Sequence, residues 1–182
     1  MIEKIVKQTR SYRILHRYIG ISLCFFFSII AFTGILLGWK KHSGGLILPN
    51  TETGTSKNLA TWLPIDSLAS IAQVAVQEKN QLKDVQIDRM DIRPEKGVIK
   101  VSFKGNYFEV QLDGTTGKVL AIHQRNSDII EQIHDGSILD NVIYANGYFK
   151  LTYTSLLGLG LLFLTISGFW LWYNPKRIRK LK

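Results

Sequence analysis

Residues Tyr18 to Trp39 read YIGISLCFFFSIIAFTGILLGW, a stretch without a single charged side chain. A second uncharged stretch, Leu151 to Tyr173, reads LTYTSLLGLGLLFLTISGFWLWY. At about 1.5 Å of rise per residue, each stretch forms a helix of roughly 33 Å, which is enough to cross a hydrocarbon core of ~30 Å. The alternative is a pair of buried core helices, but a soluble domain of 182 residues has no use for two such stretches. The sequence therefore predicts a protein that spans the membrane twice.

The net charge of +9 is confined to the two ends of the chain. Residues 1–17 carry a net charge of +4 and residues 174–182 carry +5, whereas residues 40–150 hold thirteen basic and thirteen acidic side chains. Basic segments beside a span stay on the cytoplasmic side of the membrane. We therefore expect both termini in the cytoplasm and residues 40–150 outside it. Membrane topology and anionic headgroups explain the high pI, so the lipid bilayer is an expected partner and nucleic acid is not.

Two further features concern processing and redox chemistry. The single cysteine, Cys24, lies inside the first span, so an intramolecular disulfide and cysteine-based metal motifs are excluded. The first apolar stretch is too long for a signal peptide, and Gly38-Trp39-Lys40 does not resemble a cleavage site with small residues. The first span is therefore expected to be an uncleaved anchor.

Between the spans the residue pattern changes from irregular to helical and then to alternating. Residues 40–58 are rich in Gly, Ser, Thr and Asn and predict a linker. Within the expected domain, residues 59–125, apolar positions from Ile65 to Gln81 have helical spacing. Alternating residues then predict strands at Val85–Ile92 (with one slip in register), Lys100–Lys104, Tyr107–Leu112 and Lys118–His123, joined by turns at Gly105-Asn106 and Asp113–Gly117. The pattern predicts one helix packed on a small antiparallel sheet.

Residues 126–150 connect this domain to the second span. Residues 127–139 return to helical spacing, with Ser127 as the expected cap and Asp135-Gly136 as the expected end. We expect Asn174-Pro175 to end the second membrane helix. The predicted fold class is an α+β membrane protein, in which the helix-plus-antiparallel-sheet domain is inserted between two transmembrane helices.

One side of the first span is lined with small residues. At 100° per residue, one sector contains His16, Gly20, Cys24, Ala31, Gly34 and Gly38. Gly34 and Gly38 match the GxxxG pattern, which lets another helix approach closely, although glycines scattered by chance are the alternative. We expect this sector to face protein and the bulky opposite side to face lipid. His16 is either an interfacial polar residue or a ligand or proton-handling group.

Four motifs together carry a resemblance to a known family. They are Leu15–Gly20 followed by Thr33-Gly34, Ile133–Gly136, Ser167–Trp172, and the hairpin-like stretch Tyr107–Leu120. In order and spacing they resemble the PepSY-associated transmembrane proteins, over nearly the whole chain. Larger members of that family include siderophore reductases and iron-uptake proteins of the bacterial inner membrane. In those proteins, histidines near the membrane faces bind haem and carry electrons across the bilayer.

The resemblance implies haem as the cofactor and assigns an iron-ligand role to His16 and His134. These histidines lie near opposite membrane boundaries, so they do not ligate one haem together. A second ligand must come from a second copy of the chain, from another membrane protein, or, at the outer side, from His42. Arg13 and Arg17 are expected to pair with haem propionates, because guanidinium forks match carboxylates. His123 is expected to be an ordinary surface residue.

Two functions follow from the resemblance and stay open at this point. One is a haem-dependent component of ferric iron or ferric-siderophore reduction and iron uptake, with the ferric siderophore as a further partner. The other is a non-catalytic, membrane-tethered PepSY subunit that binds or regulates a partner. The chain is shorter than the reductases and has a single helix pair, so whether it is an enzyme by itself is left open.

Overall fold

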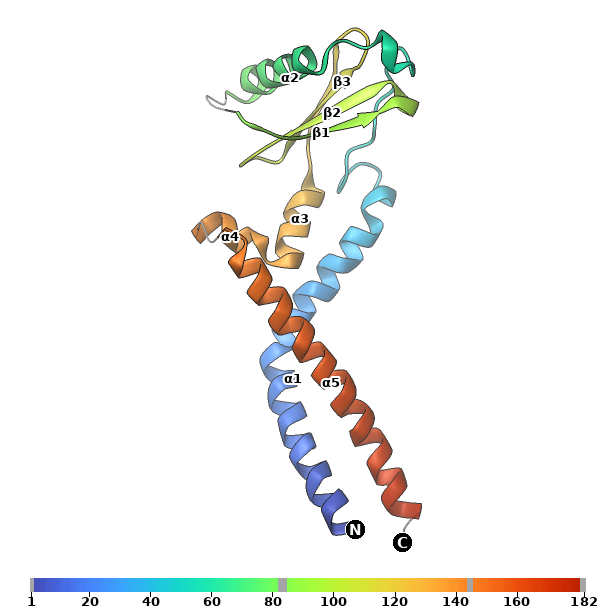
Figure 1. Ribbon diagram of the computed structural model, residues 1–182, viewed down its shortest axis with the longest axis vertical. Coiled ribbons are helices and arrows are strands. Elements are labelled where there is room, and N and C mark those ends of the chain that lie inside the picture. Colours follow the sequence, from blue (N-terminus) through green and yellow to red (C-terminus); the bar gives the residue numbers. More distant parts are fainter. Residues whose placement is uncertain (1, 82–84, 144–145, 181–182) are drawn as a thin grey trace. The chain divides into compact units, whose positions relative to one another are not determined.

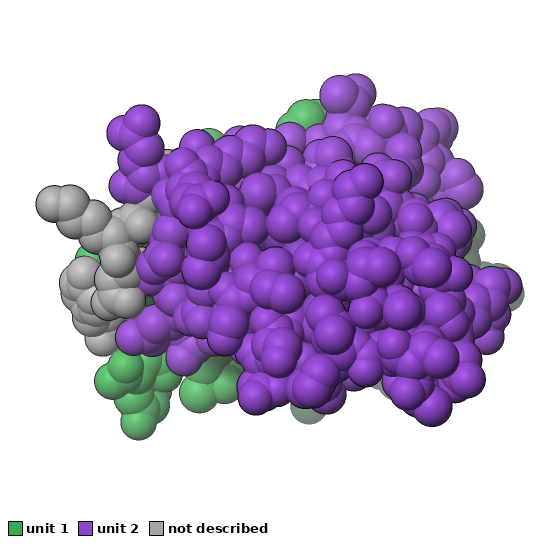
Figure 2. Space-filling model, turned by 90° about the horizontal axis from the view of Figure 1, so that it is seen from above, with its two compact units in different colours: residues 1–35, 131–182 green, residues 36–130 purple. Residues whose placement is uncertain are grey.

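A computed structural model describes residues 2–81, 85–143 and 146–180 (Figure 1). The chain divides into two compact units, coloured in Figure 2: residues 1–35 and 131–182 form the helical unit, and residues 36–130 form the sheet unit. The fold is α+β, as the sequence predicts. Two helices are long and apolar enough to cross a membrane, and a four-stranded antiparallel sheet lies between them in the sequence.

The helical unit consists mainly of two long helices that include the apolar stretches. Helix α1 is Ile2–Trp39, with its last turn in the sheet unit, and α5 is Tyr148–Lys180. The prediction that Asn174-Pro175 ends the second helix is wrong, because α5 continues through Pro175. The buried Asn174 donates from Nδ2 to Thr9 Oγ1 over 3.1 Å, and this bond holds the last turns of α5 against α1.

The two long helices run antiparallel, side by side, and most of their buried side chains are polar, with Ile5 and Leu157 as the apolar ones. Thr9 lies against Asn174 and His16 against Ser167, so both basic segments are at the same end of the helix pair (Figure 1). Thr9, Ser167 and Asn174 are buried, whereas Phe25 keeps 68% of its surface exposed. Apolar side chains outside and small polar ones between helices are typical of a membrane environment.

Glycines on both helices, α1 and α5, allow the two helices to approach each other closely. A Cβ atom at Gly20 would lie 3.7 Å from Leu164 Cδ2, whereas one at Gly38 would have no described neighbour within 4 Å. Cys24 is exposed, contrary to the expected sector. Leu23 packs against α5 in its place and would overlap any Cβ atom at Gly160. The sector of small residues follows from the sequence of α1 alone, whereas the Leu23 contact depends on the glycine at position 160 of α5.

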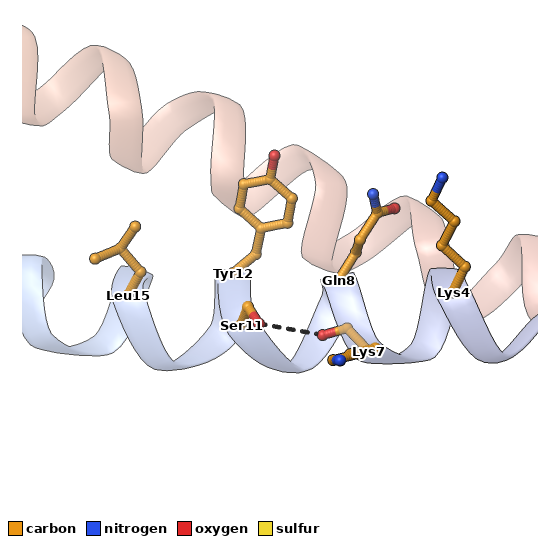
Figure 3. A pocket seen from close by; sticks show the side chains of 6 residues that line it. All are labelled: Lys4, Lys7, Gln8, Ser11, Tyr12 and Leu15. Carbon is orange, nitrogen blue, oxygen red and sulfur yellow. Dashed lines mark hydrogen bonds between the residues drawn. The ribbon is translucent and has the colours of Figure 1, made fainter.

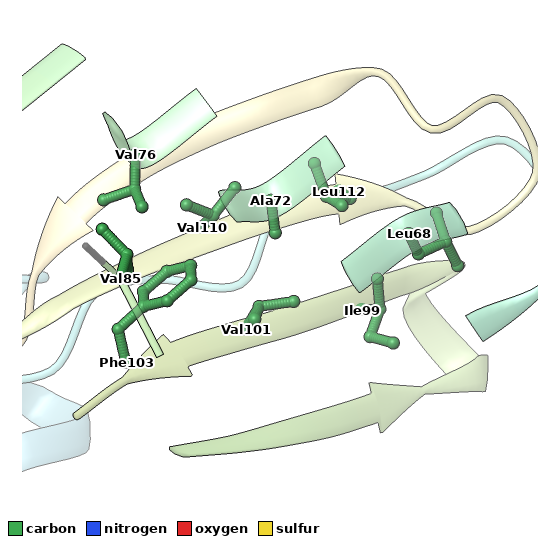
Figure 4. Close-up of a cluster of buried hydrophobic side chains, with 9 residues drawn as sticks. All are labelled: Leu68, Ala72, Val76, Val85, Ile99, Val101, Phe103, Val110 and Leu112. Carbon is green, nitrogen blue, oxygen red and sulfur yellow. The ribbon is translucent and has the colours of Figure 1, made fainter. Parts of the chain in front are cut away.

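The sheet unit has the helix and strands that the sequence predicts. Its strands β1 (Ile87–Arg93), β2 (Val98–Phe103), β3 (Phe108–Asp113) and β4 (Val119–Gln124) pair in the order β1-β2-β3-β4, all antiparallel. The predicted slip in the first strand is the register shift between Ile87 and Arg89. Helix α2 (Ile65–Asn80) packs on one face of the sheet. The core between them (Figure 4) contains Leu68, Ala72, Val76, Val85, Ile99, Val101, Phe103, Val110 and Leu112.

The other face of the sheet is also covered, although its side chains are polar. All six residues of β2 are buried, including Lys100 and Ser102. The segment expected to be a linker crosses this face. Its Glu52 N–H donates to Gln111 Oε1 over 2.9 Å, and Gln111 Nε2 donates to the Asn50 carbonyl over 2.8 Å. Residues 50–55 therefore act as a strap that buries the polar face.

The connector to α5 is two short helices instead of one. Helix α3 is Asn126–Asp135 and α4 is Ser137–Ile143, separated at Gly136, close to the predicted end. Gly136 has φ of +78°, and a Cβ atom there would lie 2.8 Å from Tyr153 Cδ1, so glycine is required. Ser127 is not the start of α3. Its N–H donates to the Ile47 carbonyl over 2.7 Å, an interaction within the sheet unit.

Candidate functional site

His16 is held by a hydroxyl group on the opposite membrane helix. Its Nδ1 atom lies 2.7 Å from Ser167 Oγ, and that hydroxyl donates its one hydrogen to the Phe163 carbonyl, also over 2.7 Å. Since the hydroxyl hydrogen is used, Ser167 Oγ accepts a hydrogen bond from Nδ1–H. With the hydroxyl hydrogen directed at a backbone carbonyl, a neutral His16 ring carries its proton on Nδ1 and its lone pair on Nε2.

His134, at the other end of the helix pair, is held in the same way. Its Nδ1 atom lies 2.9 Å from Thr33 Oγ1 of α1. The Thr33 hydroxyl donates to the Ile29 carbonyl over 2.7 Å, so it too accepts from the histidine. The lone pair of the neutral His134 ring is therefore on Nε2.

A glycine follows each of these hydroxyl residues and gives the imidazole ring its space. A Cβ atom at Gly168 would lie 3.6 Å from His16 Cε1, and one at Gly34 would lie 3.5 Å from His134 Cε1. Each histidine therefore packs on a hydroxyl–glycine pair, Ser167-Gly168 or Thr33-Gly34. Both pairs belong to the motifs that carry the family resemblance, but the sequence alone does not identify the hydroxyls as partners of the histidines.

The two histidines are far apart along the helix pair. His16 lies on α1 itself, and His134 contacts α1 at Thr33, so the two sites are separated by about 25 Å of helix rise. This is close to the thickness of a hydrocarbon core. The two side chains cannot share one metal ion.

Each histidine could hold a metal that is already bound in a macrocycle, whereas neither forms a site for a bare ion. Neither Nε2 atom has a hydrogen bond to a described residue, and neither is completely buried, so both reach the surface of the helical unit. A fixed Nδ1–H donor with a free Nε2 lone pair is the arrangement found in metal-ligating histidines. Among the described residues, no group of three His, Cys, Asp or Glu could hold a metal ion. Haem iron needs only one or two protein ligands, because the macrocycle supplies the others.

Charged groups beside His134 fix the start of α5. Asp140 accepts hydrogen bonds from the N–H groups of Phe149 and Lys150, at 3.0 and 2.8 Å, and so caps the helix. Asp135 forms an ion pair with Lys150 at 2.5 Å. Burial raises the pKa of Asp135, but hydrogen bonds from Lys150 and Ser137 outweigh it, so the pKa lies below its ordinary value. His134 therefore lies next in sequence to one of the charged residues that hold the start of α5.

The other residues predicted for the site lie apart from these contacts. Arg13 and Arg17 are exposed on α1, one turn or less from His16, and the Arg17 guanidinium lies 5.5 Å from the Tyr18 ring centroid. His42 is exposed in a short 3-10 helix, Lys40–His42, of the sheet unit. His123 lies in β4 opposite Glu109 and is half-buried rather than fully exposed.

The sheet unit has a buried ionic network that the sequence analysis did not identify. Glu109 is completely buried and accepts from Lys100 Nζ at 3.1 Å and from Arg125 Nη1 at 2.5 Å. Arg125 Nε also donates to Asp128 at 2.9 Å. Burial lowers the pKa of Arg125, but Asp128 and Glu109 raise it above its ordinary value, so the guanidinium stays charged. Lys100 and Glu109 come from β2 and β3, whereas Arg125 follows β4 and Asp128 lies in α3. Residue spacing alone does not reveal partners that are so far apart in the sequence.

A groove runs along the N-terminal part of α1 in the helical unit. It encloses about 570 Å³ and is lined by Lys4, Lys7, Gln8, Ser11, Tyr12 and Leu15 (Figure 3). All six side chains come from one helix, and the marked hydrogen bond runs from Ser11 Oγ to the Lys7 carbonyl at 3.3 Å. The lining contains no acidic side chain, so it offers no acid–base pair for catalysis.

These features define a class of protein, a membrane protein with two spans that flank a small α+β domain. The family described as PepSY-associated TM region matches residues 13–181, and the chain belongs to this family. The match includes both histidines, both hydroxyl–glycine pairs and the sheet unit, in agreement with the resemblance. Comparison with curated proteins and with solved structures found no match.

Proposed function

We propose that this membrane protein is a haem-dependent component of ferric iron or ferric-siderophore reduction and iron uptake in the bacterial inner membrane. One observation carries the proposal. His16 and His134, near the two ends of the helix pair, each form a hydrogen bond through Nδ1 with a hydroxyl of another helix and keep Nε2 available. Family membership supports the same assignment.

When bound, haem supplies one-electron chemistry, which is the change that converts ferric to ferrous iron. The residues of this chain bind and orient it. Ser167 and Thr33 hold the imidazole rings in one tautomer and make Nε2 a better ligand. Arg13 and Arg17 lie near His16 and are suited to pair with propionate groups.

The chain offers one histidine at each end of the helix pair, so bis-histidine ligation needs a second contributor. We propose a homo-oligomer or a complex with another membrane protein, in which the facing chain supplies the second ligand. His42, in the sheet unit, is the alternative second ligand that the family resemblance leaves open.

We also propose that both basic ends are cytoplasmic and that the sheet unit lies outside the cytoplasm. The positive-inside rule and the shared end of the two basic segments support this orientation. Glu95, with 93% of its side chain exposed, is a suitable reporter position. In a Cys24→Ser background, Glu95→Cys should react with an impermeant maleimide in spheroplasts. Labelling only after the inner membrane is permeabilised would overturn the orientation.

Electron transfer across vesicles tests the proposed function. Haem-loaded protein is reconstituted into liposomes that contain a ferric chelate, and an impermeant reductant is added outside. Ferrous iron should form inside the liposomes. In His16→Ala and in His134→Ala, the rate should fall to that of liposomes without protein. His123→Ala, on β4 of the sheet unit, is the matched control and should keep the rate. Equal rates in all variants would contradict the proposal.

A second candidate function is a non-catalytic, tethered PepSY subunit that binds or regulates a partner. The presence of a single histidine at each end favours it, because the chain alone does not complete a bis-histidine site. In that case the protein would stay colourless in the presence of haem and would still copurify with its membrane partner.

A further inference from the structure

The sheet unit contains a pocket of about 420 Å³ that the proposed haem function does not use. Its volume is in the range of small-molecule sites. Residues 48–51, which lead into the strap and include its first two residues, form one wall. The charged lining consists of Lys40, Lys41, Asp91, Arg93, Lys100 and Arg125. Five cationic side chains thus face one carboxylate.

Two of these cations are buried and have hydrogen-bond donors to spare. Lys100 keeps 7% of its side-chain surface and donates to Glu109, the only acceptor that its Nζ has among the described residues. Arg125 keeps 14% and uses Nε and Nη1 for Asp128 and Glu109, while Nη2 has no described partner. An ammonium group has three N–H donors and a guanidinium group has five. Both side chains therefore present unused donors at the pocket wall.

The acidic groups nearby do not neutralise the pocket. Arg93 pairs with Asp91 at 2.6 Å, and Glu109 and Asp128 lie behind the wall formed by Lys100 and Arg125. The pocket and its immediate partners therefore contain five cationic side chains but only three described carboxylates, Asp91, Glu109 and Asp128. Lys40 and Lys41 form no ion pair with any residue that the structure describes. The surplus positive charge favours an anion.

The pocket begins where the first membrane helix ends. Trp39 is the last residue of α1, and the next two residues, Lys40 and Lys41, already line the pocket. Tryptophan and lysine at the end of a span are typical of the headgroup region, where lipid phosphates lie. Lys40 and Lys41 are therefore suited to contact a phosphate group.

We propose that this pocket binds a phosphate group. Arginine and lysine are the usual phosphate-binding side chains, and a phosphate offers oxygens enough for donors from several walls. The group can belong to an anionic lipid headgroup or to a soluble phosphate ester. The proposal does not depend on haem.

The test uses the full-length protein and has two arms. In the lipid arm, native mass spectrometry compares retained phosphatidylglycerol with retained phosphatidylcholine. In the soluble arm, calorimetry follows glycerol 3-phosphate binding to protein in phosphatidylcholine nanodiscs. Lys41→Gln/Arg93→Gln changes two exposed pocket cations and spares the buried network, and Lys57→Gln/Lys96→Gln is a control with equal charge loss outside the pocket. Asp91→Asn removes the pocket's own carboxylate.

The pocket double variant should weaken phosphate binding by about tenfold or more, Asp91→Asn should strengthen it, and the control should leave it unchanged. This pattern in the lipid arm alone identifies a headgroup, and the same pattern in the soluble arm identifies a phosphate ester. No binding in either arm, or equal losses in the pocket and control variants, would overturn the proposal.

Discussion

The Nδ1 atom of His16 lies 2.7 Å from the Oγ atom of Ser167, and the serine has already donated its hydrogen to a backbone carbonyl. The serine thus determines which nitrogen of the neutral ring is free. His134 and Thr33 repeat this relationship at the other end of the helices. Both hydroxyls should therefore matter for haem affinity although neither would touch iron.

Ser167→Ala and Thr33→Val should each weaken haem binding by roughly 10–100-fold, the usual effect of losing the partner of a ligating histidine. Ser28→Ala is the matched control, because the one described partner of Ser28 Oγ is the Cys24 carbonyl of its own helix. Haem titration followed by absorbance measures the affinities, and the midpoint potential should shift as well. Unchanged affinity and potential in Ser167→Ala and Thr33→Val would contradict this role.

Gly160→Leu should separate the two membrane helices, because Leu23 occupies the space that any side chain at position 160 would need. Overpacking of this kind typically costs ~1–3 kcal/mol. Gly158→Leu, where a Cβ atom has no described neighbour within 4 Å, is the control. Unfolding in mixed micelles compares the two variants. Equal stabilities would show that the Leu23 contact does not hold the helices.

Glu109→Gln should destabilise the sheet unit by ~3–5 kcal/mol. The change removes the carboxylate that pairs with the buried Lys100 and weakens the pairing of Arg125. Glu95→Gln removes an exposed pair with Lys57 and should have almost no effect. Hydrogen exchange of peptides from β2 and β3, measured on the full-length protein, reports the local stability. Similar protection in both variants would refute the importance of the network.

Acid should loosen the strap through Asp113. Burial raises the pKa of this carboxyl, but hydrogen bonds from Thr55, Thr115 and Thr116 outweigh it, and the pKa lies below its ordinary value of 3.8. Because the folded-state pKa is the lower one, the stabilisation is present above the ordinary value and is lost as the pH falls through the folded value. Hydrogen exchange of the strap should therefore accelerate below about pH 4.

Asp113→Asn should lose much of that pH dependence and be less stable at neutral pH. Asp88→Asn, for which no such hydrogen bonds are present among the described residues, serves as the control. A strap with the same acid response in Asp113→Asn would mean that other groups control it.

The sequence predicted the parts of the fold that depend on local pattern. Two uncharged stretches gave the membrane helices, and alternation gave the strands, even the slip near Ile87. It failed where a distant contact overrides a local signal. Pro175 stays inside α5, where Asn174 is anchored to Thr9, and Lys100 is buried where it pairs with Glu109 of the neighbouring strand.

The candidate site was predictable in a similar, partial way. His16 and His134 were identified from family resemblance, but their partners Ser167 and Thr33 are 151 and 101 residues away in sequence. Such pairs appear only when the helices are packed together, α1 with α5 for His16 and α1 with α3 for His134. The cationic pocket was missed for the same reason, because its walls come from the end of α1, the strap and three strand regions.

The most direct test of the account is the visible spectrum of the purified full-length protein, with and without added haem. We predict a Soret band and, after reduction, the spectrum of low-spin, bis-histidine haem. His16→Ala should lose one haem and His134→Ala the other, while hydrogen exchange shows that both variants remain folded. A folded protein that stays colourless after haem is added would contradict the central claim that these two histidines hold haem.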